Sequence, residues 1–454
     1  MKGCEKVLKK NSYHNVEFID LTHDAMGVAK INGFPVFVKD ALKGEQAQIK
    51  ITKVNKNFAF GRLIELTTPS PFRKKPICEH FFTCGGCDIM HMNYDMQLSF
   101  KKHRVKETLR KIGHITTNVN DMVGMNNPYY YRNKAIIPFA MEEDRLVAGL
   151  YKRRSHEIID LKRCHIFPKV YSEIIKLIKS LLINYKISIY DEHTHKGLFR
   201  GVMIRHSEKT GDILLTLILN GSKILKKENI IEALNERYPM IKGIVINNNT
   251  SKGNVMLANK SKTIYGEDLL EDTLCGLTYK YTHQSFFQVN PIQTEALYQK
   301  ALNYAKLEAD FRVMDAYCGV GAIGLSAAKD VKEVIGFDVI KNNIKQAREN
   351  AKSNNVSNVH FYQASDDTVL NDEKYDNIDV LFIDPPRKGC DKSFLKRVAN
   401  KNIKRIIYIS CNVSTFSRDA NYLQKLGYKI KEVTPFDMFP QTAHIETVAL
   451  IENN

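Results

Sequence analysis

Long apolar runs are missing from this sequence. The longest, Ile213–Leu219, has the length of a strand, whereas a helix that spans a bilayer needs roughly 20 apolar residues. The opening residues, MKGCEKVLKK, carry charge but lack the apolar segment of a signal peptide. We therefore expect a cytoplasmic protein without a membrane partner.

Compositional bias, internal repeats and low-complexity segments are missing as well. The 454 residues are 43% hydrophobic and 26% charged, which is ordinary globular usage. This disfavours a fully disordered chain, a collagen-like fibre and a small disulfide scaffold. The length favours roughly three domains, and we expect a monomer.

Acidic residues are the scarcer charged class. Asp and Glu number 50 against 67 Lys and Arg, which gives a net charge of +17. Such a surplus favours a nucleic acid partner, then an anionic membrane surface; a lysine-rich proteome is the alternative that needs no partner. The nine cysteines are odd in number. Without an export signal they favour a metal, a cluster or a catalytic thiol over disulfides.

The first part of the chain, residues 1–68, reads as all-β. Its short strand-like runs are Val16–Ile19, Gly27–Ile31, Pro35–Val38, Gln46–Val54 and Ala59–Ile64. Five short strands in this length suit an OB-like barrel, a common nucleic-acid-binding shape, although a generic β-barrel fits equally well.

The second part, residues 69–275, has a mixed α+β pattern. Three prolines lead into a cysteine-rich loop, and the basic helical stretch Gln97–Ile112 follows. That stretch either contacts phosphate or is a solvated helix face. We expect a central domain that helps to bind RNA.

The third part, residues 276–454, alternates strands with helices. Its strand-like runs are Val313–Tyr317, Val334–Asp338, Val359–Gln363, Val380–Asp384, Arg405–Ser410, Lys429–Thr434 and Glu446–Ile451. The first five are joined by helix-length segments, which indicates a parallel, doubly wound α/β sheet. A final antiparallel pair is typical of a class I (Rossmann-like) methyltransferase.

Glycines follow the first of these strands. Gly319 and Gly321 lie where a backbone turn can approach a ligand, although this spacing would fit NAD as well. Asp338 ends the next strand, about 20 residues on, where a carboxylate can hold ribose hydroxyls. Asp315 within the first strand and the seven-strand ending favour S-adenosylmethionine over NAD.

The fourth strand ends in Asp384 and a Pro-Pro turn, at the edge where such sheets bind ligands. Methyltransferases that act on amino groups carry an aromatic residue after the two prolines. Arg387 stands there, which disfavours nitrogen methylation.

The fifth strand ends in Cys411, ahead of a helix N-terminus, which favours thiolate. A thiolate that adds to carbon-6 of uracil makes carbon-5 reactive towards a sulfonium methyl group. A base must then remove the carbon-5 proton. Glu446 opens the last strand and is the candidate, with His444 as rival because of its pKa. Cys390, near the Pro-Pro turn, is a minor rival nucleophile.

These residues resemble the RNA (uracil-5-)-methyltransferases, and residues 12–67 resemble their RNA-binding TRAM domain. The matching segments are Phe287–Asn290, Cys318–Gly321, Asp384–Gly389, Ser410–Asn412, Phe439–Pro440 and His444–Glu446. Val413 departs from the pattern, because many members have Pro there.

The resemblance implies that Cys411 is the nucleophile and Glu446 the proton acceptor. It also implies that four side chains hold S-adenosylmethionine: Gln288, Tyr317, Asp338 and Asp384. The target uridine is expected to be flipped out of its stack. Phe286 and Phe287 are candidates to fill the vacated space, and one of them is expected in the core.

Four cysteines are candidate metal ligands: Cys78, Cys84, Cys87 and Cys164. The spacing alone favours zinc by base rate, but zinc ribbons rarely combine a short pair with an isolated fourth ligand. In the ribosomal-RNA branch of the family that this sequence resembles, the matching cysteines bind a 4Fe-4S cluster. The transfer-RNA branch typically lacks these cysteines. The resemblance thus implies 23S ribosomal RNA as substrate. A transfer-RNA T-loop methyltransferase and a catalytically silent RNA-binding protein are the alternatives.

Overall fold

The computed structural model describes residues 8–453, apart from the side chains of Asp366 and Asp367. The chain forms two compact units. Among the described residues, the first contains 8–104 together with Phe439–Ala443, and the second contains Val105–Met438 and residues 444–453. No helix within residues 8–453 is long and apolar enough to cross a membrane.

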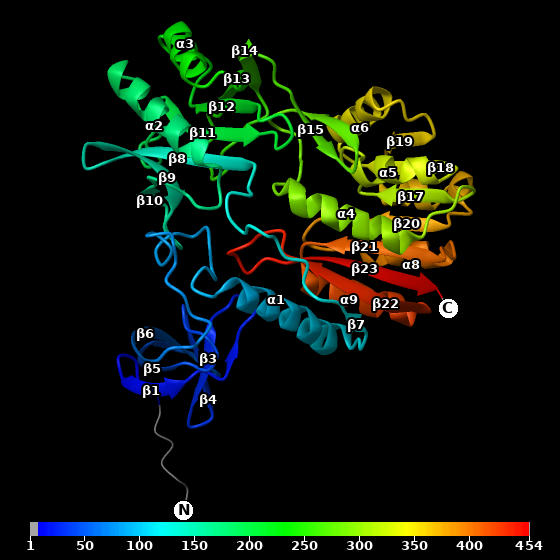
Figure 1. Ribbon diagram of the computed structural model, residues 1–454, viewed down its shortest axis with the longest axis horizontal. Coiled ribbons are helices and arrows are strands. Elements are labelled where there is room, and N and C mark those ends of the chain that lie inside the picture. Colours follow the sequence, from blue (N-terminus) through cyan, green and yellow to red (C-terminus); the bar gives the residue numbers. More distant parts are fainter. Residues whose placement is uncertain (1–7, 454) are drawn as a thin grey trace, which may run out of the picture. The chain divides into compact units, whose positions relative to one another are not determined.

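The first unit contains a six-stranded sheet (Figure 1). Its strands are β1 (Tyr13–Glu17), β2 (Asp20–Leu21), β3 (Gly27–Ile31), β4 (Phe34–Val38), β5 (Gln46–Val54) and β6 (Ala59–Thr68). They pair in the order β1-β5-β6-β4-β3-β2. The two edge strands, β1 and β2, are consecutive in the chain, which brings the edges of the sheet together as an OB-like fold requires. Alternate residues such as Val36 and Ile49 form its core.

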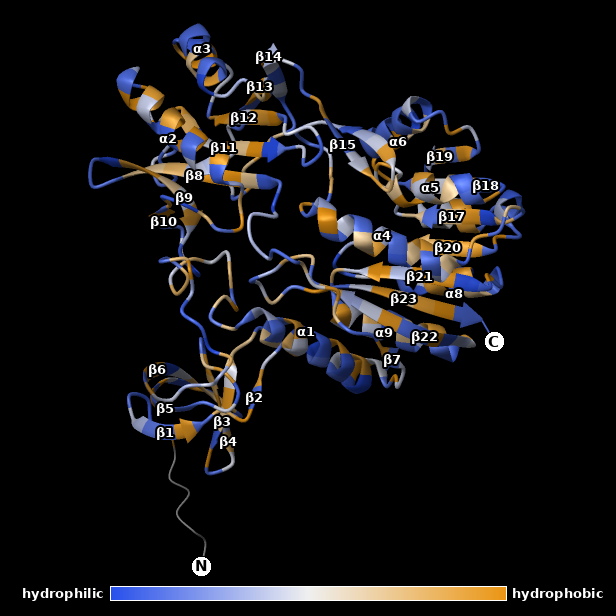
Figure 2. Ribbon diagram, in the orientation of Figure 1, coloured by the Kyte–Doolittle hydropathy of each residue, from blue (hydrophilic) through white to orange (hydrophobic). Residues whose placement is uncertain are grey.

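A seven-stranded sheet opens the second unit. Its strands are β8 (Lys134–Glu142), β9 (Arg145–Tyr151), β10 (Ile158–Asp160), β11 (Phe199–His206), β12 (Ile213–Leu219), β13 (Ile241–Asn248) and β14 (Ser261–Gly266). The helices α2 (Lys169–Asn184) and α3 (Lys227–Arg237) accompany it. Strand β12 is the long apolar run, and it is buried along its whole length. Figure 2 shows the hydrophobic colours of such central strands.

An eight-stranded sheet carries the C-terminal part of the second unit. Its strands are β7 (Asn118–Val119), β17 (Arg312–Ala316), β18 (Glu333–Asp338), β19 (Val359–Gln363), β20 (Val380–Ile383), β21 (Arg405–Ser410), β22 (Tyr428–Phe436) and β23 (Glu446–Asn453). They pair in the order β19-β18-β17-β20-β21-β23-β22-β7. The first five are parallel, and β23 is antiparallel to both of its neighbours. The predicted Rossmann-like sheet with its antiparallel ending is thus confirmed.

Helices follow most strands of this sheet, as in other doubly wound folds. They are α4 (Pro291–Ala305), α5 (Ala322–Ala327), α6 (Lys341–Ser353), α7 (Asp366–Leu370), α8 (Lys392–Asn400) and α9 (Val413–Lys425). A hairpin, β15 (Leu270–Leu274) and β16 (Leu277–Tyr281), precedes α4. Strand β7 was not predicted; it comes from far upstream and pairs with β22 at the edge.

Candidate active site

Most of the predicted site residues lie at the carboxyl ends of four parallel strands. Tyr317 follows β17, Asp338 ends β18, Asp384 follows β20 and Cys411 follows β21. Because these strands are parallel neighbours, the four residues lie along one edge of the sheet, where such sheets bind ligands. Strand β23 runs antiparallel to β21, so its first residue, Glu446, lies at the same edge.

The turn after β17 leaves room for a ligand. Tyr317, Gly319 and Gly321 have left-handed φ values of 60°, 56° and 81°. A Cβ atom at Gly321 would lie 2.6 Å from the Phe361 ring, whereas one at Gly319 would have no atom within 4 Å. Gly321 is therefore needed for packing, and Gly319 exposes backbone to open space. This geometry fits a cofactor that approaches the main chain closely.

Asp338 organises the same turn. Its Oδ2 accepts hydrogen bonds from the Gly319 amide and the Asn343 side chain, both at 3.1 Å, and its Oδ1 accepts one from the Ile340 amide at 2.7 Å. A carboxylate has about four acceptor sites. Capacity thus remains for one ligand hydroxyl, which is compatible with the predicted ribose contact.

The segment before α4 is held through its main chain and its asparagine. The Gln288 carbonyl accepts from Asn133 Nδ2 at 3.4 Å. Asn290 caps α4 and donates to the Met438 carbonyl at 3.0 Å. Phe287 is buried and stacks on Tyr281 with ring centroids 4.4 Å apart, whereas Phe286 is 67% exposed. One of the two phenylalanines is therefore a core residue, as expected.

Cys411 has an environment that disfavours its thiolate. Burial raises its pKa to about 11, and the carboxylates of Glu446 and Asp384 contribute to the rise. The Arg387 guanidinium lowers that pKa by its charge and by a side-chain hydrogen bond. The expectation that the helix N-terminus would yield a thiolate is therefore wrong for the protein without substrate, because desolvation and two acidic neighbours outweigh that effect.

Three carboxyl groups of this sheet, within β17, directly after β20 and at the start of β23, have raised pKa values. Burial raises the pKa of Glu446 well above its usual value, Asp384 adds to the rise, and Arg387 opposes it. Burial also raises the pKa of Asp384 to about 6 and that of Asp315 to about 7. Closely spaced acids with raised pKa values are typical of sites that move protons.

The rival base, His444, and the rival nucleophile, Cys390, have surroundings that differ from those of Glu446 and Cys411. His444 is exposed, and its Nδ1 lies 3.2 Å from Arg387 Nη2. Cys390 is buried beneath the Pro-Pro turn, and burial raises its pKa to about 12. Its amide donates to Asp419 Oδ2 at 2.8 Å, a contact that ties the turn to α9. The surroundings of Cys390 are therefore those of a residue that supports the fold of the turn.

Arg387 is a site residue whose role sequence reasoning missed. The turn that carries it is fastened to the start of α9, because the Arg387 carbonyl accepts from Asn412 Nδ2 and Thr415 Oγ1, both at 3.2 Å. Its side chain is the cationic group that bears on both Cys411 and Glu446. The available signal was its place directly after the Pro-Pro pair.

The basic stretch 97–112 forms α1 (Tyr94–Thr108), followed by a π-helical turn, Leu109–Gly113. Two cations of its first half have partners inside the protein. Lys101 is fully buried and donates to the Phe439 carbonyl at 3.2 Å, and Arg104 donates to the Ala443 carbonyl. The later cations, such as Arg110, lie on an exposed face.

The four predicted metal ligands come from both units. Cys78, Cys84 and Cys87 belong to the first unit and Cys164 to the second. Burial raises the pKa of Cys78, and the nearby Cys84 contributes. Among residues 8–453 no group of three or more His, Cys, Asp or Glu side chains is arranged to hold a metal ion.

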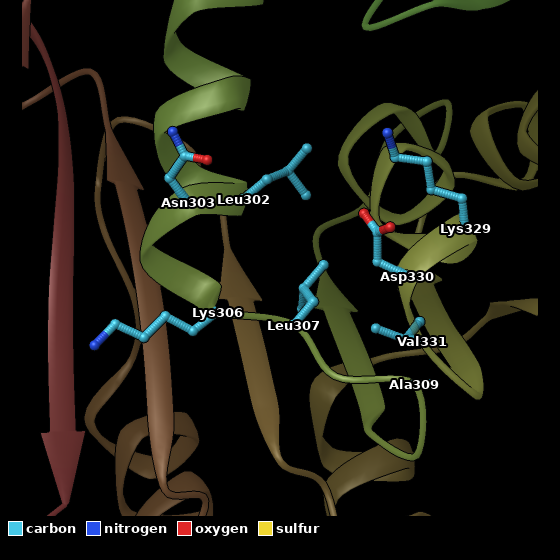
Figure 3. Close-up of a pocket in the computed structure, with 8 residues that line it drawn as sticks. All are labelled: Leu302, Asn303, Lys306, Leu307, Ala309, Lys329, Asp330 and Val331. Atoms are coloured by element: carbon cyan, nitrogen blue, oxygen red, sulfur yellow. The ribbon is translucent and has the colours of Figure 1, made fainter.

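An open cavity of about 580 Å³ lies elsewhere on the second unit (Figure 3). It is lined by Leu302, Asn303, Lys306, Leu307, Ala309, Lys329, Asp330 and Val331. These residues precede β17 and β18 in the chain, so they lie at the amino ends of the strands. The cavity is therefore separate from the edge that carries Cys411.

Comparisons with known proteins agree with this architecture. The family model for tRNA (uracil-5-)-methyltransferases matches residues 93–454, and the TRAM domain model matches residues 8–64. An uncharacterized RNA methyltransferase from Oceanobacillus iheyensis is 42% identical over 453 residues, 99% of this chain and 98% of the relative. One from Clostridium tetani is 42% identical over 446 residues, 98% of this chain and 97% of the relative.

Among solved structures, the chain is similar to the tRNA (uracil-54, C5)-methyltransferase of Pyrococcus abyssi in complex with S-adenosyl-L-homocysteine. The TM-score is 0.78 at 27% identity, over 96% of this chain and 99% of that one. The family model covers most of the chain, and it agrees with a Rossmann-like sheet whose carboxyl edge holds a thiol and buried acids. The protein therefore belongs to the tRNA (uracil-5-)-methyltransferase family and is an S-adenosylmethionine-dependent RNA methyltransferase with an N-terminal TRAM domain.

Proposed function

We propose that this enzyme methylates carbon-5 of a uridine in 23S ribosomal RNA through a covalent adduct with Cys411. The observation that carries the proposal is the grouping of a thiol with a buried carboxyl group and a guanidinium at one edge of the sheet: Cys411, Glu446 and Arg387. Nucleophile, base and a stabilising cation are the parts that this chemistry needs.

In this mechanism the Cys411 thiolate adds to carbon-6 of the uracil ring, which makes carbon-5 nucleophilic. S-adenosylmethionine, when bound, supplies an electrophilic methyl group. Glu446 then takes the carbon-5 proton, the electrons of the C–H bond form the C5=C6 double bond, and the Cys411–C6 bond breaks. The thiolate is regenerated, and no net oxidation occurs.

The electrostatics of the site assign Arg387 a supporting role. Its charge opposes the rise in the pKa of both Cys411 and Glu446. Once ionised, Glu446 is a strong proton acceptor, because a buried carboxylate gains by binding a proton. The residues Gln288, Tyr317, Asp338 and Asp384, with the turn at Gly319 and Gly321, remain the proposed binding groups for the cofactor.

Trapping with 5-fluorouridine tests the covalent step. Fluorine at carbon-5 cannot leave as a proton does, so wild-type enzyme with S-adenosylmethionine and fluorinated RNA should form an adduct that survives denaturation. Cys411→Ala should form none, whereas Cys390→Ala, if it folds, should still be trapped. Equal trapping of RNA by Cys411→Ala and wild type would refute the assignment.

The choice of ribosomal RNA depends on the four cysteines and on the resemblance that interprets them. Transfer RNA is the second candidate, favoured by the likeness to the Pyrococcus abyssi enzyme. Mapping 5-methyluridine in both RNAs from cells that lack the protein decides between them. Loss from transfer RNA alone would contradict the ribosomal proposal.

A 4Fe-4S cluster on Cys78, Cys84, Cys87 and Cys164 stays a prediction. Methyl transfer moves no electrons overall, so any such cluster would be structural. Anaerobically purified protein should be brown and contain iron and sulfide, and Cys84→Ala should lose the colour. Colourless, fully active protein with zinc would contradict the cluster.

A further inference from the structure

Three cations of the second unit meet where β8 begins, beside β11 (Figure 1). Lys134 is the first residue of β8, and its partner in the ladder on β11 is Arg205. Side chains of such facing residues lie on the same face of the sheet, with about 5 Å between their Cβ atoms. Arg132 lies two residues before Lys134, and its Nε donates to the Lys134 carbonyl at 3.2 Å. Arg132, Lys134 and Arg205 therefore form one cationic cluster.

The contacts of Arg205 leave its charge uncancelled. Its side chain is 2% exposed, and its Nη1 donates to the carbonyls of Thr282 at 2.6 Å and Ser285 at 2.8 Å. Its guanidinium carbon lies 4.9 Å from the centre of the Tyr281 ring. Burial raises the pKa of Tyr281 and that of Tyr171 on α2, so both are neutral. These contacts satisfy the guanidinium group but carry no negative charge.

The acidic groups of the neighbouring elements have other partners. Glu208 Oε2 lies 3.4 Å from His206 Nε2, and Asp268 Oδ2 lies 2.6 Å from His283 Nδ1. The carboxylate of Asp272 accepts from two main-chain amides, both at 3.1 Å. These contacts engage the acids of the region with groups other than the cationic cluster.

Lys134 itself is half-buried. Burial lowers the pKa of its ammonium group to about 8, and the charges of Arg205 and Arg132 contribute to the fall. Within residues 8–453, no hydrogen bond or ion pair engages that ammonium group. Like charges that crowd one another away from water are unfavourable in the protein without ligand. An anion bound to the cluster would relieve that repulsion.

Asn133 joins the cluster to the segment before α4. Its amide donates to the Val289 carbonyl at 2.9 Å, and its Nδ2 donates to the Gln288 carbonyl at 3.4 Å. The cluster thus adjoins a segment that we propose to bind the cofactor. S-adenosylmethionine carries a sulfonium, an ammonium and a single carboxylate, so its net charge is positive and three cations would repel it. An RNA phosphate is anionic, and lysine and arginine are its usual partners.

We propose that Lys134 and Arg132 bind a phosphate group of the substrate RNA close to the methylated uridine, and that the buried charge of Arg205 adds to the attraction. The proposal deepens the proposed function: it needs RNA as the substrate, but neither a particular RNA nor the chemistry assigned to Cys411. A bound phosphate favours the charged form of Lys134. RNA binding near pH 8 should therefore take up a proton, and RNA affinity should fall as the pH rises.

The test uses the full-length enzyme and a fluorescein-labelled oligouridylate, with the Kd measured at several salt concentrations and from pH 7 to pH 9. Lys134→Met and Arg132→Met each remove one proposed contact. Lys134→Arg keeps a positive charge that does not titrate in this range. Lys176→Met removes an exposed lysine of α2 as a matched control.

We expect Lys134→Met and Arg132→Met each to weaken RNA binding about tenfold at pH 7. Each should also reduce the slope of log K against log salt by about 0.7. The Kd for S-adenosylmethionine should stay close to wild type. The Tm of Lys134→Met should not fall, because the change removes a repulsion, whereas loss of a lysine that supports the fold would lower it.

The pH series identifies the titrating group. The wild-type Kd for RNA should rise about tenfold from pH 7 to pH 9, because the protonated fraction of a group with a pKa of about 8 falls about tenfold over that range. Lys134→Arg should bind RNA like wild type at pH 7 and lose this dependence. Lys176→Met should retain it.

Four results would overturn the proposal. Unchanged RNA affinity and salt slope in both folded methionine variants would mean that the cluster does not contact phosphate. Weaker binding of S-adenosylmethionine with RNA binding intact would assign the anion to the cofactor's carboxylate. A lower Tm with equal loss of RNA and cofactor binding would mean that the cations support the fold. A pH dependence that persists in Lys134→Arg would exclude Lys134. None of these results affects the role of Cys411, which trapping tests separately.

Discussion

In the proposed mechanism Cys411 must be ionised to attack a pyrimidine, yet its pKa in the protein alone is about 11. Roughly one thiol in a thousand would then be ionised at pH 8. The same burial that raises this pKa removes water from the reacting atoms, so the anion that does form is poorly solvated and reactive. The proposed mechanism therefore requires that substrate binding change the balance between Arg387 and the two carboxylates.

The first prediction concerns the reactivity of this thiol. Alkylation of Cys411 by iodoacetamide in the absence of RNA should rise about tenfold per pH unit from pH 7 to pH 10 without a plateau. The reason is a pKa of about 11, above the range sampled. Mass spectrometry of the modified peptide gives the rate at each pH.

Two variants separate the effects of Glu446 and Arg387 on the pKa of Cys411. Glu446→Gln removes an acidic neighbour and should lower the pKa of Cys411, so alkylation at pH 8 should accelerate several-fold. Arg387→Met removes the cation and should slow it. A plateau below pH 9 in the wild-type enzyme, or no response to either change, would contradict this account of the site.

At the scale of an element, β17 carries an internal acid that affects stability. Asp315 is buried and accepts from the Gly324 amide at 2.9 Å, and its pKa is raised to about 7. In the unfolded chain an Asp has a pKa of about 3.9. The folded state therefore binds the extra proton, and this residue's contribution to stability falls as the pH rises from about 4 to 7.

The second prediction follows from the direction in which the stability changes with pH. Asp315→Asn keeps an acceptor for the Gly324 amide but removes the charge. It should stabilise the protein without ligand at pH 8 by about 2 kcal/mol and have little effect at pH 4 to 5. Thermal denaturation at both pH values measures the difference. Equal shifts at both would mean that ionisation of Asp315 is not the cause.

The strands illustrate what could be predicted from the sequence. The predicted bounds of β3, β5, β12, β19 and β21 match those observed. Each is a short apolar or alternating run, so burial alone determines it. Because the carboxyl ends of parallel strands share an edge, Tyr317, Asp338, Asp384 and Cys411 could be grouped without coordinates.

Other features depend on partners far away in the chain. Lys101 reads as part of a basic face, but its acceptor is 338 residues away, so local sequence gives no sign of its burial. Strand β7 is two residues long, too short to show an alternation of apolar and polar residues. Arg387 was noted only for the aromatic residue it replaces, since its effect on Cys411 requires the folded turn.

At the scale of the whole molecule, the net charge of +17 implies strong, salt-sensitive RNA binding. The OB-like sheet has a suitable outer face. Phe37, Phe58 and Phe60 are only half-buried there, with ring centroids 5.4 to 6.2 Å apart. Lys53 is the β5 partner of Phe60. Aromatic rings beside cations are typical of surfaces that stack single-stranded bases.

The third prediction is that Phe60→Leu weakens RNA binding by about 1 kcal/mol or more, because a leucine keeps the packing but cannot stack on a base. Lys53→Met should instead reduce the slope of log K against log salt by about 0.7. Titration at several salt concentrations measures both. Unchanged RNA affinity in the Phe60 variant would exclude this face.

Strand β7 has a consequence for how the chain can be divided. The Asn120 amide donates to the Val433 carbonyl and Thr117 donates to the Ile430 carbonyl, so residues 117–120 cover the outer edge of β22. A fragment that begins at residue 276 would keep every catalytic candidate but leave that backbone edge unsatisfied. An uncovered edge pairs with other chains. The methyltransferase sheet of such a fragment would then tend to associate through its exposed edge. In the full-length protein that edge is covered by a segment that comes much earlier in the sequence.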